Sequence, residues 1–92
     1  MTPEAIHAFL EKEKPTAVIK IDFKKRNVLR GMFVRIADYN DLRAKNFWRI
    51  VPEANIEQWN KREDNNLLRI FNGVEFTKLT SITAGVAKRT VA

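Results

Sequence analysis

The densest group of residues that could bind a ligand is basic. Lys24, Lys25 and Arg26 are consecutive in a polar segment between two apolar stretches, and Arg30 follows four residues later. Ammonium groups act as point charges and a guanidinium as a planar fork, so such a run at a strand turn can contact successive phosphates. The same run is also typical of a solvated turn without a ligand, and the sequence leaves both interpretations open.

Two further pairs of residues have groups that bind nucleobases or small ligands. Tyr39 and Asn40 lie in a polar segment, where an aromatic face can stack on a base and an amide can bond its Watson–Crick edge. The alternative is a turn stabilised by an Asn or Asp side chain, with a half-buried tyrosine. Asn72 and Gly73 can present amides and a carboxamide to a ligand, although a left-handed turn alone explains this pair.

Two tryptophans are candidates for a contact surface. Phe47 and Trp48 alternate along one expected strand, so one ring enters the core and the other is covered by a helix or exposed. An exposed Trp48 would add a second stacking platform for single-stranded nucleic acid. Trp59 is expected to pack against the sheet, with a subunit interface as the alternative.

Catalytic and metal-binding chemistry is sparsely represented. The chain has no cysteine and His7 is its only histidine, so we expect no disulfide framework, thiolate or imidazole zinc site, or Ser-His-Asp system. Its three glycines are too scattered for a phosphate-binding loop. Two acid pairs, Asp38 with Asp41 and Glu63 with Asp64, lack a companion base or nucleophile. The sequence predicts a non-enzymatic protein with no catalytic residue, cofactor or metal.

The charge distribution favours an anionic partner. Seventeen Lys and Arg against eleven Asp and Glu give a formal net charge of +6. Residues 20–49 hold nine basic and three acidic groups, so this region alone carries that excess. Such a concentration attracts phosphate backbones through counterion release, but it also fits basic side chains solvated on strand faces. No apolar run reaches the roughly 18 to 20 residues that cross a bilayer, so we expect a cytoplasmic protein without membrane contact.

The elements that position these residues follow from length and periodicity. A chain of 92 residues that is 45% hydrophobic is expected to form one domain. We place that domain at residues 1–83 and expect a flexible tail at residues 84–92, which are small and polar. Thr2 and Pro3 favour a helix start, and the helix is expected to end near Lys14 after about three turns.

Five strands are expected after this helix. Gly31 predicts a sharp bend in the second strand. Residues 38–45 are expected to form a loop or a helical turn, and Asn55 with Gln58 resembles a capping box that opens a short helix before strand four. A flat hairpin at residues 72–73 would pair side chains poorly, so we expect a corner there. The strands are expected at residues 17–23, 28–37, 46–51, 67–71 and 74–79, with a 3₁₀ turn interrupting an extension of the last toward Ile82.

Two stretches, combined with this order of elements, carry a family resemblance: Gly31, Phe33, Ile36, Asp38, Asn40 and Leu42, then Ile70, Phe71, Asn72, Gly73, Phe76 and Leu79. In these features the chain resembles the Sm-like family. The resemblance implies an N-terminal helix, a five-stranded SH3-like barrel, and subunits joined edge to edge in RNA-binding rings. Three features depart from the family pattern: the spacing of Asp38 and Asn40 from Gly31, a longer loop running to Lys45, and Asn72 where a basic residue usually precedes Gly73.

The expected fold class is therefore mainly β, with an N-terminal helix and a small, strongly bent, partly open SH3-like or Sm-like barrel. The expected function is weak binding of single-stranded RNA through a basic face. The alternative is a protein-interaction or self-assembly module that forms a homo-oligomer by strand-edge pairing and binds no nucleic acid. The candidate nucleic-acid-binding residues are Lys24, Lys25, Arg26, Arg30, Tyr39, Asn40, Asn72 and Gly73.

Overall fold

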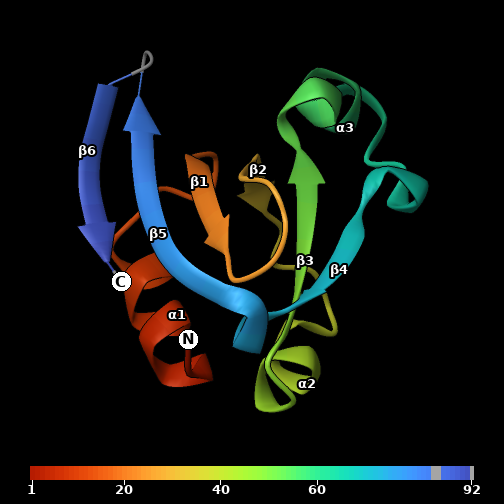
Figure 1. Cartoon of the computed structure of the whole chain (residues 1–92). Helices are drawn as coiled ribbons and strands as arrows, with labels where there is room; N and C mark the ends of the chain where they lie inside the picture. Colours follow the sequence, from red (N-terminus) through yellow and green to blue (C-terminus); the bar gives the residue numbers. More distant parts are fainter. Residues whose placement is uncertain (84–85, 92) are drawn as a thin grey trace.

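A single antiparallel sheet organises the chain, as the computed structural model shows (Figure 1). The structure describes the backbone of residues 1–83 and 86–91 and the side chains of residues 1–82. The sheet has six strands in the order β4-β3-β2-β1-β5-β6. The strands are β1 (Val18–Phe23), β2 (Leu29–Phe33), β3 (Phe47–Pro52), β4 (Arg69–Asn72), β5 (Phe76–Thr83) and β6 (Val86–Val91). The helices are α1 (Pro3–Glu11), α2 (Tyr39–Ala44) and α3 (Ile56–Arg62), with 3₁₀ helices η1 (Glu53–Asn55), η2 (Asn65–Leu67) and η3 (Gly73–Glu75).

The N-terminal helix forms for the reasons that the sequence indicates. The Thr2 hydroxyl accepts a 3.1 Å hydrogen bond from the Ala5 N–H, which satisfies one of the free amides of the first turn. Ile6, Phe9 and Leu10 are buried on one face of α1. The predicted N-terminal helix is confirmed and its apolar face packs on the sheet, but it ends at Glu11, before the expected end near Lys14.

The main core lies between α1 and the inner face of the sheet. Alternation in β1 places Ile19 and Ile21 inward, and both are essentially fully buried. Trp48 is buried with 1% exposure, and Phe47 is half-buried, so the opposite placement of these two rings is confirmed. The buried residues of this core are Ile6, Phe9, Leu10, Ile19, Ile21, Phe33, Trp48, Ile50, Phe71, Phe76 and Leu79.

A second, smaller core explains why the second strand is apolar on both faces. Met32 and Val34 follow the outer face of the sheet and pack with Val51 of β3. Trp59 of α3 closes this cluster and is buried, which confirms the prediction that it packs against the sheet. The region α3 to η2 therefore covers the outer face of β2 and β3.

Several element boundaries differ from the expectation. The second strand ends at Phe33 and not at residue 37, whereas the helical alternative expected for residues 38–45 is confirmed as α2. The expected capping box is absent: Asn55 caps α3 without a side-chain hydrogen bond, because η1 runs directly into that helix. β4 starts two residues late because η2 occupies residues 65–67.

The connection between the fourth and fifth strands is the corner that the sequence predicts. β4 passes into β5 through η3, and the two strands are separated by three others in the sheet order. The 3₁₀ turn therefore precedes β5 and does not interrupt it. Figure 1 shows β5 curving strongly toward this corner.

β1 to β5 match the five expected strands, and β6 adds a sixth, which pairs with β5. Among the described strands β4 and β5 do not pair, so hydrogen bonding leaves the sheet open. Part of the expected tail, residues 84, 85 and 92, lies outside the described residues, and its flexibility stays a prediction.

Candidate functional site

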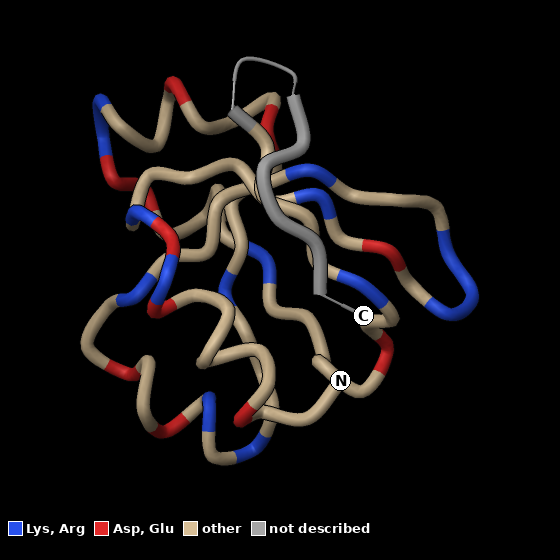
Figure 2. The backbone as a smooth tube through the Cα atoms, turned by 90° about the vertical axis from the view of Figure 1, so that its left-hand side faces the viewer, with Lys and Arg blue, Asp and Glu red and all other residues tan. Residues whose placement is uncertain are grey.

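The basic turn, defined here as Lys24, Lys25 and Arg26, connects β1 to β2 and is exposed throughout. Figure 2 shows it as a blue segment projecting from the right-hand side of the molecule. Arg30 of β2 is exposed as well, and it lies opposite Lys20 in the β1–β2 register, so both side chains share the outer face. No carboxylate among residues 1–82 forms an ion pair with these basic groups.

The aromatic rings of Phe23 and Phe71 lie against the basic turn. The guanidinium carbon of Arg26 lies 5.2 Å from the ring centroids of both Phe23 and Phe71. These rings are themselves 5.7 Å apart, and a cation over an aromatic face is attracted by the ring quadrupole. Arg69 shares the face of β4 that carries Phe71, because alternate residues of a strand point the same way. The turn is therefore a cationic surface at the end of the sheet, with two aromatic rings beneath Arg26.

The η3 corner lies directly beside this turn. The Lys24 N–H donates to the Glu75 carbonyl at 2.9 Å, which brings the exposed Asn72 into the same region. Asn72 Oδ1 accepts from the Val74 N–H at 3.0 Å, and its amide nitrogen has no partner among residues 1–82. Gly73 is buried, and its N–H and carbonyl already bond within the chain, so Asn72 is the member of this pair with a free donor.

Tyr39 and Asn40 belong to a different place, the helix α2. The Tyr39 ring contacts Trp48 at a centroid distance of 5.9 Å, and its hydroxyl lies 3.0 Å from Nδ1 of His7. Burial raises the pKa of Tyr39 above its ordinary value, and the neighbouring Arg35 and Arg43 partly oppose that shift. Tyr39 is thus the half-buried tyrosine of the alternative interpretation. The interpretation of Trp48 as an exposed stacking platform is wrong, because this ring lies in the core.

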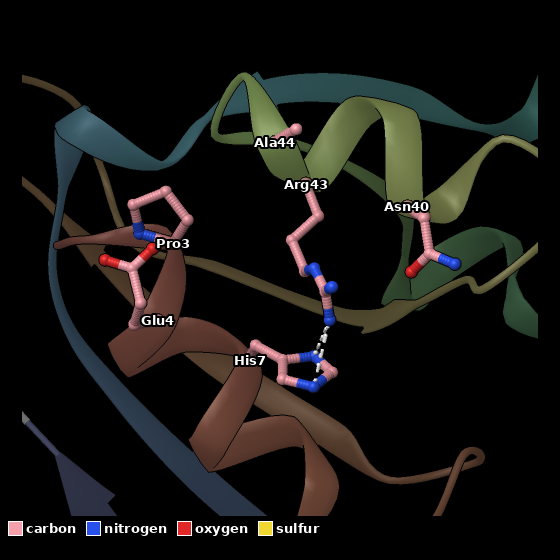
Figure 3. Close-up of a pocket in the computed structure, with 6 residues that line it drawn as sticks. All are labelled: Pro3, Glu4, His7, Asn40, Arg43 and Ala44. Carbon is pink, nitrogen blue, oxygen red and sulfur yellow. Dashed lines mark hydrogen bonds between the residues drawn. The ribbon is translucent and has the colours of Figure 1, made fainter.

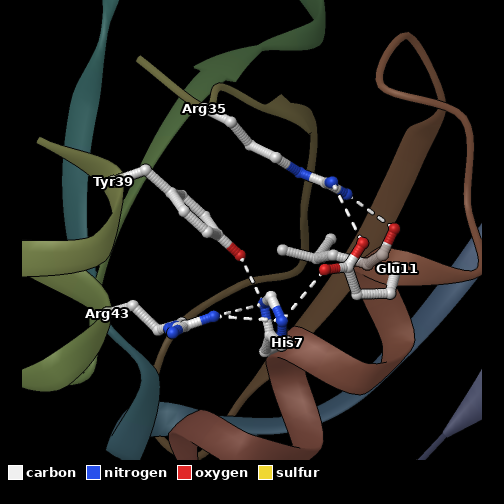
Figure 4. Close-up of polar contacts among 6 residues, drawn as sticks. His7, Glu11, Arg35, Tyr39 and Arg43 are labelled. Carbon is white, nitrogen blue, oxygen red and sulfur yellow. Dashed lines mark hydrogen bonds and ion pairs between the residues drawn. The ribbon is translucent and has the colours of Figure 1, made fainter. Parts of the chain in front are cut away.

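A polar cluster surrounds His7 between α1 and α2 (Figure 4). Nε2 of His7 lies 3.0 Å from the Glu11 carboxylate, one helical turn away, and Nδ1 faces the Tyr39 hydroxyl. A ring protonated at Nε2 donates to Glu11 and accepts at Nδ1, which satisfies both contacts. Arg43 Nη1 approaches both ring nitrogens at 3.0 Å, and Arg35 lies 3.7 Å from Glu11.

The sequence contained one local signal of this cluster. His7 and Glu11 have the spacing of four residues that places two side chains on one helix face. The approach of Arg43 depends on how α2 sits against α1, and no local pattern reports that. Among residues 1–82, no three His, Asp or Glu side chains are arranged to hold a metal ion.

Comparison with protein-family models, with curated proteins and with solved structures finds no match to this chain. None of the helices in the described part of the chain has the length and apolar character needed to cross a membrane.

Proposed function

We propose that this chain is a non-enzymatic, SH3-like or Sm-like barrel protein that binds single-stranded RNA through the basic turn. The observation that carries the proposal is the gathering of Lys24, Lys25 and Arg26 on one exposed turn, with no carboxylate of residues 1–82 paired to them. Unpaired cations on a projecting turn can neutralise phosphates without first breaking an internal ion pair. Arg30 extends the basic surface along β2.

The aromatic support under Arg26 favours a single strand over a duplex. The Arg26 guanidinium lies near both rings while its residue remains exposed, and bases splayed out from a single strand stack on arginine planes. Asn72, beside the turn, adds a carboxamide donor for a base edge. Phosphate contacts then supply most of the affinity, and stacking tolerates any base.

The barrel assignment is supported by strand order and curvature. Five antiparallel strands in the order β4-β3-β2-β1-β5 line the main core with their inner face, and a bent fifth strand turns the sheet back toward β4 (Figure 1). Small antiparallel sheets that curl around a single core form this class of partly open barrel.

The test measures binding of a short fluorescent RNA by anisotropy at about 50 and about 200 mM salt. We expect affinity to fall steeply between these concentrations. The variant K25E/R26E/R30E is expected to bind at least about tenfold more weakly, and its plot of log affinity against log salt is expected to lose about two units of slope, since three single-strand contacts are removed.

A control variant distinguishes the effect of where the charges are reversed from the effect of the change in net charge. K12E/K14E/R62E makes the same change, from a formal net charge of +6 to zero, at exposed positions away from the turn. It is expected to bind far more tightly than K25E/R26E/R30E. Equal loss in both variants, or wild-type binding that is absent or insensitive to salt, contradicts the proposal.

The open edge of β4 favours a second candidate, self-assembly. β4 pairs only with β3 among the described strands, and Ile70 on it is 50% exposed. An unpaired strand edge with an apolar side chain is a template for strand addition by another copy. Light scattering is expected to show an oligomer that Ile70→Lys dissociates, and a monomeric wild type contradicts this candidate.

A further inference from the structure

A groove with a volume of about 450 Å³ separates α1 from α2 (Figure 3). This volume is within the range of small-molecule sites, roughly 300 to 1,000 Å³. The groove lies apart from the basic turn and shares none of its residues. Its walls are formed by Pro3, Glu4 and His7 from α1 and by Asn40, Arg43 and Ala44 from α2.

Arg43 is incompletely satisfied at this site. Its Nη1 and the Tyr39 hydroxyl both approach Nδ1 of His7 at 3.0 Å, but a neutral imidazole nitrogen has one lone pair. The other ring nitrogen faces Glu11 and needs its proton for that contact. No carboxylate of residues 1–82 forms an ion pair with Arg43. Within residues 1–82, most of its five N–H donors therefore have no hydrogen-bond acceptor.

The charges around the groove leave a positive excess at the Arg43 end. Arg35 and Arg43 lie 5.9 and 5.8 Å from the Tyr39 ring centroid, and the Glu11 carboxylate is already shared by His7 and Arg35. Glu4 lies on the other side of the groove near Pro3, with its carboxylate directed away from the Arg43 guanidinium (Figure 3).

We infer that this groove binds a small molecule through a phosphate or carboxylate group held between Arg43 and Asn40. A guanidinium fork matches two oxygens of such a group, and charge-assisted hydrogen bonds of this kind are the strong ones. Asn40 is exposed on the same helix, and its carboxamide supplies a neutral donor. His7 is a positioning residue: Glu11 and Tyr39 orient its ring, and Arg43 Nη1 packs against that ring at 3.0 Å from both nitrogens.

The single histidine provides a direct probe. Inorganic phosphate and acetate are titrated separately into the full chain at constant pH and ionic strength, and NMR follows the His7 ring and the Asn40 amide. Saturable shifts at both positions are expected. A response to phosphate alone identifies a phosphate-bearing ligand, and a response to acetate alone identifies a carboxylate; shifts absent with both overturn the inference.

Variants tie the response to the proposed residues. Arg43→Gln is expected to weaken binding by about tenfold or more, because it removes the charged fork. Asn40→Asp places a carboxylate at an exposed position and is expected to weaken it by repulsion, so it carries the test if Arg43→Gln fails to fold. Arg62→Gln and Asn60→Asp, both on α3, make the same changes away from the groove and are expected to bind normally.

Unchanged affinity in Arg43→Gln or Asn40→Asp overturns the inference. Neither substitution touches the basic turn, so RNA binding and anion binding in the groove can fail independently.

Discussion

The Gly73 N–H donates a 2.8 Å hydrogen bond to the Asn46 carbonyl, which joins the η3 corner to the start of β3. Asn46 has only 7% exposure, and its side chain accepts from Trp48 Nε1 at 2.8 Å and donates to the Met1 carbonyl at 3.0 Å. A buried amide that is satisfied in this way fixes its neighbours strongly, because any loss leaves a polar group unpaired. Asn46 therefore connects the η3 corner, the N-terminus and β3 through its hydrogen bonds.

Gly73→Ala is expected to destabilise the fold because there is no room for a Cβ. The added carbon would overlap the Asn46 amide and lie 2.6 Å from Cδ1 of Ile6. We expect the free energy of unfolding to fall by about 1 to 3 kcal/mol, as for overpacked cores. Urea denaturation measures it, and Val74→Ala, at an exposed neighbour, is the control. Equal stability of the two variants would show that the corner can relax.

Two substitutions at Asn46 distinguish the stabilising effect of its side chain from that of its backbone conformation. Both Asn46→Gly and Asn46→Ala remove the acceptor of the Trp48 indole, which we expect to cost about 1 to 3 kcal/mol. Asn46 also has φ of 63°, in the left-handed region, where alanine is strained by about 1 kcal/mol or more. Asn46→Ala is therefore expected to unfold at lower urea than Asn46→Gly; the reverse order would contradict the role of the backbone.

Local signals predicted the elements well and their boundaries less well. The Thr2 cap and the alternation around Ile19 and Ile21 are readable because both depend on residues close in sequence. The poor side-chain match across Asn72 and Gly73 correctly predicted the corner. The hydrogen bonds of Asn46 were not predicted, because its partners come from the N-terminus and from η3 and meet only in the folded chain.

The candidate sites were likewise predictable where they depend on residues close in sequence and not where they depend on packing between distant elements. The basic turn is visible as three consecutive residues, whereas its support by Phe71 depends on how β4 approaches the turn. The sequence placed Tyr39 and Asn40 together with the basic residues in one binding surface. The structure assigns them to α2, where packing against α1 creates a separate groove with Arg43.

The ion pair between Asp38 and Arg49 is expected to make stability depend on acid pH. Arg49 Nη2 donates to Asp38 Oδ2 at 2.7 Å and Nε donates to Oδ1 at 3.2 Å, and these bonds hold the pKa of Asp38 below its ordinary value of 3.8. A lowered carboxyl pKa contributes stability that is fully present above the unfolded value and is lost as pH falls through the folded value.

Asp38→Asn is therefore expected to be less stable than the wild type at neutral pH and to converge with it at low pH. Urea denaturation across the acid range measures the difference. Asp41→Asn is the matched control, since Asp41 forms no ion pair among residues 1–82. A difference between wild type and Asp38→Asn that persists unchanged at low pH would exclude the ion pair as its cause.

Tyr39 is expected to titrate above its ordinary pKa of 10.0, because burial disfavours the phenolate more than Arg35 and Arg43 favour it. It is the only tyrosine, so ultraviolet absorbance against pH reports this group alone. Arg43→Gln removes one stabilising cation and is expected to raise the pKa further, whereas Arg62→Gln leaves it unchanged. A pKa lowered by Arg43→Gln would contradict the arrangement around the His7 cluster.

The same shift predicts the alkaline stability of the fold. A phenol with a raised folded pKa contributes stability that is fully present below the unfolded value and is lost as pH rises through the folded value. Tyr39→Phe lacks this contribution, so the difference in unfolding free energy between it and the wild type is expected to shrink over that interval. Because both proteins carry the same lysines, their ionisation cancels in the comparison, and a constant difference would show that burial does not raise the pKa of Tyr39 in solution.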